Sequence, residues 1–275
     1  MLAWAGAFSA IKRLTDDGIA APDIAIGRYL VAGPGFGVAL WLSGGLPGLT
    51  RRELGRLVAA GLFVVAGYHL ALNRGEADTS AGASAVIVAV APGLTLLLSV
   101  GAGLEHFSRR RLAGLAAAFA GVLVVVLLGS GQSLGASSVS GPLLVVAAAG
   151  TFAAYNVLVK PLVSRHSPIA VTAAASLIGT LALLPLSSRA TASDATGMGL
   201  GPWLLVLYLG VVCTLGGYIF WTVGLRRVDP SRAVSFIYGI PVAAVAIGAL
   251  TLGEPVTAWL AAGGLLIVGG VALAQ

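Results

Sequence analysis

The chain has 275 residues, a mean hydropathy of +0.99, 58% hydrophobic residues and only 9% charged ones. Soluble domains carry about 25% charged residues, so this composition excludes a soluble protein and indicates an integral membrane protein that crosses the bilayer many times. The net charge of +6 is more typical of cytoplasmic loops than of nucleic-acid binding, and the single cysteine, Cys213, excludes an intramolecular disulfide.

Apolar runs, separated by charged or Gly/Pro/Ser-rich breaks, predict an all-α protein with ten transmembrane helices. The runs lie near 1–15, 22–42, 54–73, 80–101, 109–129, 141–162, 168–187, 201–223, 231–252 and 256–274. The first run is interpreted as a span and not as a cleavable signal peptide, although it is short before Lys12. Either residues are missing before it, or Lys12 extends its ammonium group to the membrane interface.

The first two spans contain three residues that could meet a solute. Trp4 and Phe8 lie one helical turn apart in the first span, and Arg28 lies within the second. Aromatic residues at helical spacing more often pack against other helices than bind a substrate, so both roles stay open for Trp4 and Phe8. Arg28 could meet a substrate carboxylate, but a structural role, reaching the interface or bonding neighbouring carbonyls, is favoured.

The third span has the clearest polar interruption, Tyr68, His69 and Asn73 in the stretch AGYHLALN. A spacing of four residues places His69 and Asn73 on one helical face. Polar groups inside a bilayer tend to face the protein interior or a water-filled path, so we expect these residues to line a substrate cavity. The alternative is that they form helix-to-helix hydrogen bonds that hold the bundle together.

Later spans add further candidates for substrate binding. These are Tyr155 and Asn156 in the sixth span, Tyr218 and Trp221 in the eighth, and Ser235 and Tyr238 in the ninth. Together they fit a pocket in which rings stack against a ring.

Two prolines lie within spans, Pro92 in the fourth and Pro241 in the ninth. Each removes a backbone hydrogen bond, and their symmetric placement predicts paired hinges, with a static kink as the alternative.

The basic residues predict the orientation of the chain. An even number of spans places both termini on one side, with the loops after spans 2, 4, 6 and 8. Eleven basic residues lie on that side: Arg51, Arg52, Arg56, Arg109, Arg110, Arg111, Lys160, Arg165, Arg226, Arg227 and Arg232. Four lie on the other: Lys12, Arg13, Arg74 and Arg189. The positive-inside rule therefore predicts cytoplasmic termini.

An internal repeat is visible at a fixed offset of 149 residues. The segments GLFVVAGYHLALNRG (61–75) and GVVCTLGGYIFWTVG (210–224) align three glycines, and the alignment pairs His69 with Tyr218. The same offset pairs Pro92 with Pro241 and Glu105 with Glu254. The chain is therefore predicted to divide into five-helix repeats at 1–135 and 136–275. Because five is odd, the second repeat is inverted, an arrangement typical of secondary transporters with a central substrate site.

These features resemble the EamA family of the drug/metabolite transporter superfamily. The resemblance rests on the two five-span repeats, WAGAFSAIK in span 1, the Arg-aromatic pair RY (28–29) and the Pro…Glu elements that end spans 4 and 9. Within the family, GYHLALN and AAYNVLVKPL look most like the YddG-type aromatic amino acid exporters of bacteria. The resemblance implies a basket of helices around a central cavity, lined chiefly by spans 1, 3, 4, 6, 8 and 9, in the inner membrane.

The expected function is export of aromatic amino acids and related small aromatic metabolites by alternating access. The alternative is export of another metabolite or drug, such as an aliphatic amino acid or a cationic aromatic compound. No GxxxxGK[ST] loop supports the use of ATP, and no cofactor or metal is expected. The expected partners are the small-molecule substrate and membrane lipid, with no nucleic acid and with a monomer as the oligomeric expectation.

The placement of ionisable residues bears on coupling and catalysis. All ten acidic residues lie at or near span ends or in loops, and His69 is the one mid-membrane group that titrates near neutral pH. A uniporter is therefore preferred over coupling of protons by His69. Catalysis is not expected, because His106 and His166 lie in predicted loops and Cys213 has a threonine and apolar neighbours.

Overall fold

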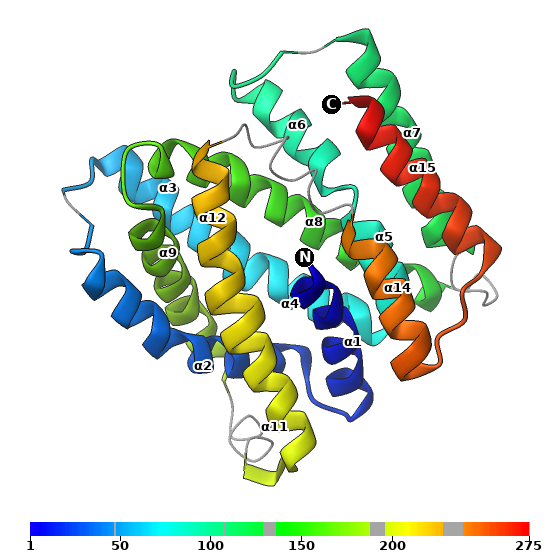
Figure 1. The fold of residues 1–275 in the computed structure, drawn as a ribbon, viewed down its shortest axis with the longest axis horizontal. Helices are drawn as coiled ribbons and strands as arrows, with labels where there is room; N and C mark the ends of the chain where they lie inside the picture. Colours follow the sequence, from blue (N-terminus) through cyan, green and yellow to red (C-terminus); the bar gives the residue numbers. More distant parts are fainter. Residues whose placement is uncertain (47, 107, 129–135, 188–195, 228–238, 275) are drawn as a thin grey trace.

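The computed structural model describes residues 1–46, 48–106, 108–128, 136–187, 196–227 and 239–274, and these residues contain helices and no strands. Figure 1 shows α1 near the middle of the assembly and α7 beside α15 at one edge. The α-helices are α1 (Leu2–Asp16), α2 (Ala21–Leu42), α3 (Arg51–Gly61), α4 (Tyr68–Ala77), α5 (Ala81–Val88), α6 (Ala91–Gly101), α7 (Arg109–Leu128), α8 (Ala136–Val163), α9 (Pro168–Leu183), α11 (Leu200–Leu207), α12 (Gly217–Arg227), α14 (Gly239–Leu252) and α15 (Ala258–Ala274).

Seven helical segments of the described residues are long and apolar enough to cross a membrane. They are Ala21–Leu42, Arg51–Ala77, Ala81–Gly101, Arg109–Leu128, Val139–Val163, Pro168–Leu186 and Leu200–Arg227. Helices α1, α14 and α15 are shorter, and part of the predicted ninth span, 231–238, lies outside the described residues. The protein is thus an all-helical, multi-pass membrane protein, while the full set of ten spans stays a prediction.

Two of the long segments contain a stretch of π-helix. Segment η1 (Leu62–Gly67) joins α3 to α4, and segment η3 (Tyr208–Gly216) joins α11 to α12. A π-helical turn holds an extra residue, so it rotates the side chains that follow it relative to those before. Both stretches end directly before the helices that carry polar and aromatic residues into the interior, which are α4 and α12.

One of the two predicted hinge prolines lies at a helix start. Helix α5 ends at Val88 and α6 begins at Ala91, so Pro92 follows a break in the span and costs no helical hydrogen bond there. Pro241 lies within α14, and the residues before Gly239 are outside the described part of the chain. A hinge function for either proline stays a prediction.

Glycines allow α7 and α15 to pack with their backbones in contact. Gly114 faces the carbonyl of Gly270, and Gly121 faces the carbonyl of Gly263, with no room for a Cβ atom at any of the four positions. Small residues permit this close approach of membrane helices. In Figure 1 the pair α7–α15 lies at one edge, away from the central helices.

Candidate functional site

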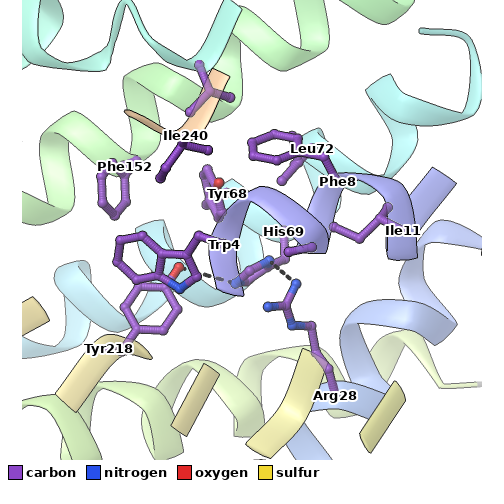
Figure 2. A pocket seen from close by; sticks show the side chains of 12 residues that line it. Trp4, Phe8, Ile11, Arg28, Tyr68, His69, Leu72, Phe152, Tyr218 and Ile240 are labelled. Atoms are coloured by element: carbon purple, nitrogen blue, oxygen red, sulfur yellow. Dashed lines mark hydrogen bonds between the residues drawn. The ribbon is translucent and has the colours of Figure 1, made fainter. Parts of the chain in front are cut away.

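A cavity lies among the central helices, and residues from α1, α2, α4, α5, α8, α12 and α14 line it (Figure 2). Its lining residues are Trp4, Ala7, Phe8, Ile11, Arg28, Tyr68, His69, Leu72, Val88, Phe152, Tyr218 and Ile240. The cavity volume is about 40 Å³, which holds a few water molecules but no amino acid. The cavity is therefore too small for an amino acid in this arrangement, and lining side chains must separate before one can bind there.

Helix α1 presents one face to the cavity. Trp4, Phe8 and Ile11 follow one another at helical spacing and project from α1 in Figure 2. The indole of Trp4 is fixed by a 2.8 Å hydrogen bond from its Nε1 to the carbonyl of Cys213. That carbonyl belongs to η3, where π-helical geometry leaves backbone groups available for such bonds.

Aromatic rings form a continuous network around the cavity. Trp4 contacts Tyr218 at 5.8 Å between ring centroids, Tyr68 contacts Phe152 at 5.6 Å, and Phe152 contacts Trp221 at 5.8 Å. These centroid distances lie in the range of favourable edge-to-face and offset ring contacts. The rings come from α1, α4, α8 and α12, so the network joins helices from both halves of the chain.

His69 is the polar centre of this network. Its Nδ1 lies 3.1 Å from a guanidinium nitrogen of Arg28, and its Nε2 lies 3.4 Å from the hydroxyl of Tyr218. A guanidinium group only donates hydrogen bonds, so Nδ1 must accept and the ring proton belongs on Nε2. The geometry therefore requires a neutral imidazole that donates toward Tyr218.

Arg28 enters the cavity wall from α2, with its guanidinium directed at His69 (Figure 2). It is 3% exposed, and it also donates to Thr214 Oγ1 at 2.9 Å and to the carbonyl of Leu209 at 3.5 Å. Among the described residues no carboxylate lies within ion-pair distance of it. A guanidinium has five N–H donors, and these three contacts use three of them. The bond to the Leu209 carbonyl matches the structural role that the sequence favoured for Arg28, and the guanidinium also lies at the cavity wall, with donors left over for an anionic group.

Five of the residues predicted to bind substrate line the cavity: Trp4, Phe8, Tyr68, His69 and Tyr218. Asn73 does not, because its Nδ2 donates to the carbonyl of Ala21 at 3.1 Å. That contact matches the structural alternative of helix-to-helix bonding.

Tyr155, Asn156 and Trp221 form a second layer behind the lining. Trp221 Nε1 donates to Asn156 Oδ1 at 2.9 Å, and the hydroxyl of Tyr155 lies 3.2 Å from Thr222 Oγ1. These bonds fix the rings that support the cavity wall. Ser235 and Tyr238, the candidates from the ninth span, lie outside the described residues.

The sequence reasoning missed several apolar members of the lining. Phe152 precedes Tyr155 by three residues, and Leu72 follows His69 by three, so helical periodicity extended from the polar candidates would have found both. Val88 and Ile240 carry no such signal, because neither lies three or four residues from a predicted substrate-binding residue.

The groups that line the cavity are suited to recognising a small solute. The cavity offers ring faces, a hydroxyl, an imidazole and a cation. Within the part of the chain that the structure describes, no three His, Cys, Asp or Glu side chains come together as metal ligands. Such a set of groups suits a small solute that combines an aromatic ring with a negative charge.

Comparison with known proteins places this site in a family. The model of the EamA-like transporter family matches residues 1–127 and 139–274. An uncharacterized transporter of Archaeoglobus fulgidus is 31% identical over 270 residues, which cover 97% of this chain and 92% of the relative.

Two further relatives have names that refer to amino acids. A probable terminal-alkyne amino-acid exporter of Streptantibioticus cattleyicolor is 29% identical, covering 99% of this chain and 90% of its own length. A probable amino-acid metabolite efflux pump of Salmonella typhimurium is 31% identical, covering 70% of this chain and 66% of its own length. A solved crystal structure shares the fold with a TM-score of 0.63 at 20% identity, over 100% of this chain and 96% of the other.

Proposed function

The chain belongs to the EamA-like transporter family, and from that premise we propose that it exports aromatic amino acids and related small aromatic metabolites across the bacterial inner membrane. Transport proceeds by alternating access around the cavity between α1, α4, α8 and α12, without ATP. The N- and C-termini are cytoplasmic, in keeping with the excess of basic residues predicted on that side.

The observation that carries this proposal is the cation in an aromatic cavity. Arg28 is buried, has no carboxylate partner among the described residues, and stands beside His69 and Tyr218. Burying a cation without a counter-charge costs free energy, and an incoming carboxylate recovers it through charge-assisted hydrogen bonds. The rings of Trp4 and Phe152 then supply faces for the aromatic end of the same molecule.

The names of two relatives support the amino-acid part of the proposal, since both refer to amino-acid export or efflux. The choice of an aromatic side chain rests on the lining alone. The same lining argues against cationic aromatic compounds, because Arg28 would repel them and none of the described residues that line the cavity is acidic.

The proposed mechanism uses two inverted repeats, and several equivalent features support that arrangement. Segments η1 and η3 end 149 residues apart. Lys12 donates to the carbonyl of Ala77, and Lys160 donates to the carbonyl of Leu225, so both bonds span 65 residues. In the packing of α7 on α15, Gly114 contacts Gly270 and Gly121 contacts Gly263. The offset of 149 converts the first contact into the second, as expected of a two-fold relation between the repeats. Such repeats let a transporter open alternately to either side of a fixed central site.

A transport panel with the purified chain in proteoliposomes tests the substrate class. Phenylalanine, tryptophan and tyrosine are expected to enter down their gradients, and threonine and a paraquat-like dication are expected to enter no faster than into protein-free liposomes. Transport of threonine without any aromatic amino acid would overturn the proposal in favour of an aliphatic amino-acid exporter. Transport of the dication would overturn the role assigned to Arg28.

A further inference from the structure

A buried acidic side chain, Glu76, lies on the same helix as His69, beyond the residues that line the cavity. Glu76 follows His69 by seven residues on α4, which places it on the same helical face and about 10 Å further along the axis. Its side chain is 0% exposed, and neither carboxyl oxygen has a hydrogen-bond partner among the described residues. The sequence analysis placed Glu76 at a span end, but the structure buries it completely.

The nearest cation does not neutralise this carboxyl group. The charged groups that act on Glu76 from the surrounding elements are Glu254, Lys12 and Arg28. The ammonium of Lys12 instead binds Asp16 at 2.9 Å and the carbonyl of Ala77 at 3.4 Å. On α4 itself, Arg74 and Asp78 pair with each other at 3.6 Å on the surface. Helix α5 carries no charge, and the one charged residue of α8, Lys160, lies at that helix's far end.

Glu254 is a second carboxylate at this place, and its role is already defined. Its two oxygens accept hydrogen bonds from the backbone amides of Ala81 at 2.7 Å and Gly82 at 3.0 Å, at the start of α5. A helix N-terminus favours a negative charge, and both oxygens of Glu254 already have donors there. A second negative charge on Glu76 would be repelled by it and would lack any donor, which a buried ion cannot tolerate.

The fold itself does not need an acid at this position. The offset of 149 that pairs Gly75 with Gly224 also pairs Glu76 with Leu225, which is equally buried. A leucine therefore fills the corresponding place in the other half. Burying the carboxyl group of Glu76 costs free energy, and packing does not require that group. We therefore look for a functional role for it.

We propose that Glu76 is the proton-binding group of this transporter and that export of one substrate molecule is coupled to entry of one proton. The proposal rests on the transport activity proposed above, but not on the aromatic substrate. Glu76 is protonated and neutral in the form described here, in which its carboxyl group is buried. In the form open to the outside, water reaches it, and the ionised carboxylate takes a proton there. In the form open to the cytoplasm, the proton leaves through the cavity next to His69. Coupling of this kind replaces the uniport that the sequence analysis preferred.

Substrate accumulation against a pH gradient tests the coupling. Liposomes containing the full chain are made one pH unit more acidic inside, with the membrane potential held at zero by valinomycin and equal potassium concentrations. One-for-one exchange then supports about tenfold accumulation of substrate inside, since one pH unit is a factor of ten in proton concentration. The Glu76→Gln variant, which keeps the shape but binds no proton, is expected to reach a ratio of one while still exchanging labelled for unlabelled substrate. Asp78→Asn, a neighbouring surface acid, is the matched control and should accumulate like the natural chain.

The proposal fails if the natural chain accumulates nothing under the pH gradient while it exchanges substrate, or if Glu76→Gln accumulates as the natural chain does. Accumulation driven by a sodium gradient alone would also overturn it. Failure of every aromatic compound in the panel would contradict the proposed substrate and leave the coupling to be measured with the compound that is transported.

A stability measurement needs no substrate, so it tests the proposal even if no compound in the panel is transported. On this proposal the folded chain keeps a proton on Glu76 that the unfolded chain loses above about pH 5, so its melting temperature in detergent should fall as pH rises from there. That fall should be smaller in Glu76→Gln, or in Glu76→Leu if the glutamine variant does not fold. Equal pH dependence in the natural chain and the variant would overturn the proposal.

Discussion

At the scale of single residues, the site depends on three polar groups that hold one another in place. Arg28 donates to His69, and His69 faces Tyr218. The sequence pairs His69 with Tyr218 through the repeat, and it favoured a structural role for Arg28. Only the three-dimensional arrangement brings α2 against α4 and reveals that no acid accompanies the cation among the described residues.

Replacing Arg28 tests its contact with a carboxylate. Arg28→Gln should lower the affinity for phenylalanine by about tenfold to a hundredfold, because a hydrogen bond to a charged group contributes about 1.5–3 kcal/mol. The affinity for 2-phenylethanol, an uncharged aromatic compound without a carboxylate, should not fall. The measurement is competition against labelled phenylalanine, and the ratio of the two affinities does not depend on how much protein is folded. Arg28→Lys keeps the charge, so its affinity for phenylalanine should lie between those of the natural chain and Arg28→Gln. Equal losses of affinity for both ligands would assign Arg28 to a structural role alone.

Asn73 provides the opposite case, a polar residue that acts in structure. Asn73→Ala removes the bond to the carbonyl of Ala21 and should lower the melting temperature slightly, since such bonds in membranes contribute about 0.6–1.7 kcal/mol. Transport per folded molecule should stay unchanged, because Asn73 does not line the cavity. Loss of transport at an unchanged melting temperature would return Asn73 to the binding site.

At the scale of helices, sequence periodicity and breaks predicted most segments, but not their internal geometry. The predicted spans near 54–73 and 201–223 are found as Arg51–Ala77 and Leu200–Arg227, each longer than predicted. The π-helical stretches η1 and η3 were not predicted, because an extra residue in a helical turn leaves no mark in an apolar sequence. The break before Pro92 was predicted, since proline cannot continue a helix without loss of a backbone bond.

The packing of α7 on α15 gives a test at this scale. Gly270→Leu would place a side chain against the backbone of Gly114 and Ala118, and the expected loss of stability is at or above the upper end of about 1–3 kcal/mol. Gly269→Leu, one residue earlier, meets nothing within 4 Å and should be tolerated. The folded fraction of each variant by size-exclusion chromatography in detergent separates the two outcomes. Equal yields would show that α7 and α15 are not held by close glycine contact.

At the scale of the whole molecule, composition and the fixed offset predicted the class of protein well. An integral, multi-pass transporter follows from the apolar content, and the central cavity lies among the predicted helices, with α2 as an addition. What the sequence could not supply was the pairing of distant side chains, which depends on how the helices rotate against one another. The buried Glu76 illustrates this, because its sequence position near a span end resembles that of exposed acids such as Asp78.

The central claim is that the cavity recognises an aromatic ring and a carboxylate in one molecule. Counterflow tests it most directly: liposomes containing the chain are loaded with unlabelled phenylalanine, and uptake of labelled phenylalanine is followed without any ion gradient. The account predicts a transient uptake above equilibrium that external phenylalanine or tryptophan abolishes, and that threonine or phenethylamine does not reduce. Uptake no greater than in protein-free liposomes, or equal inhibition by all four compounds, would contradict it.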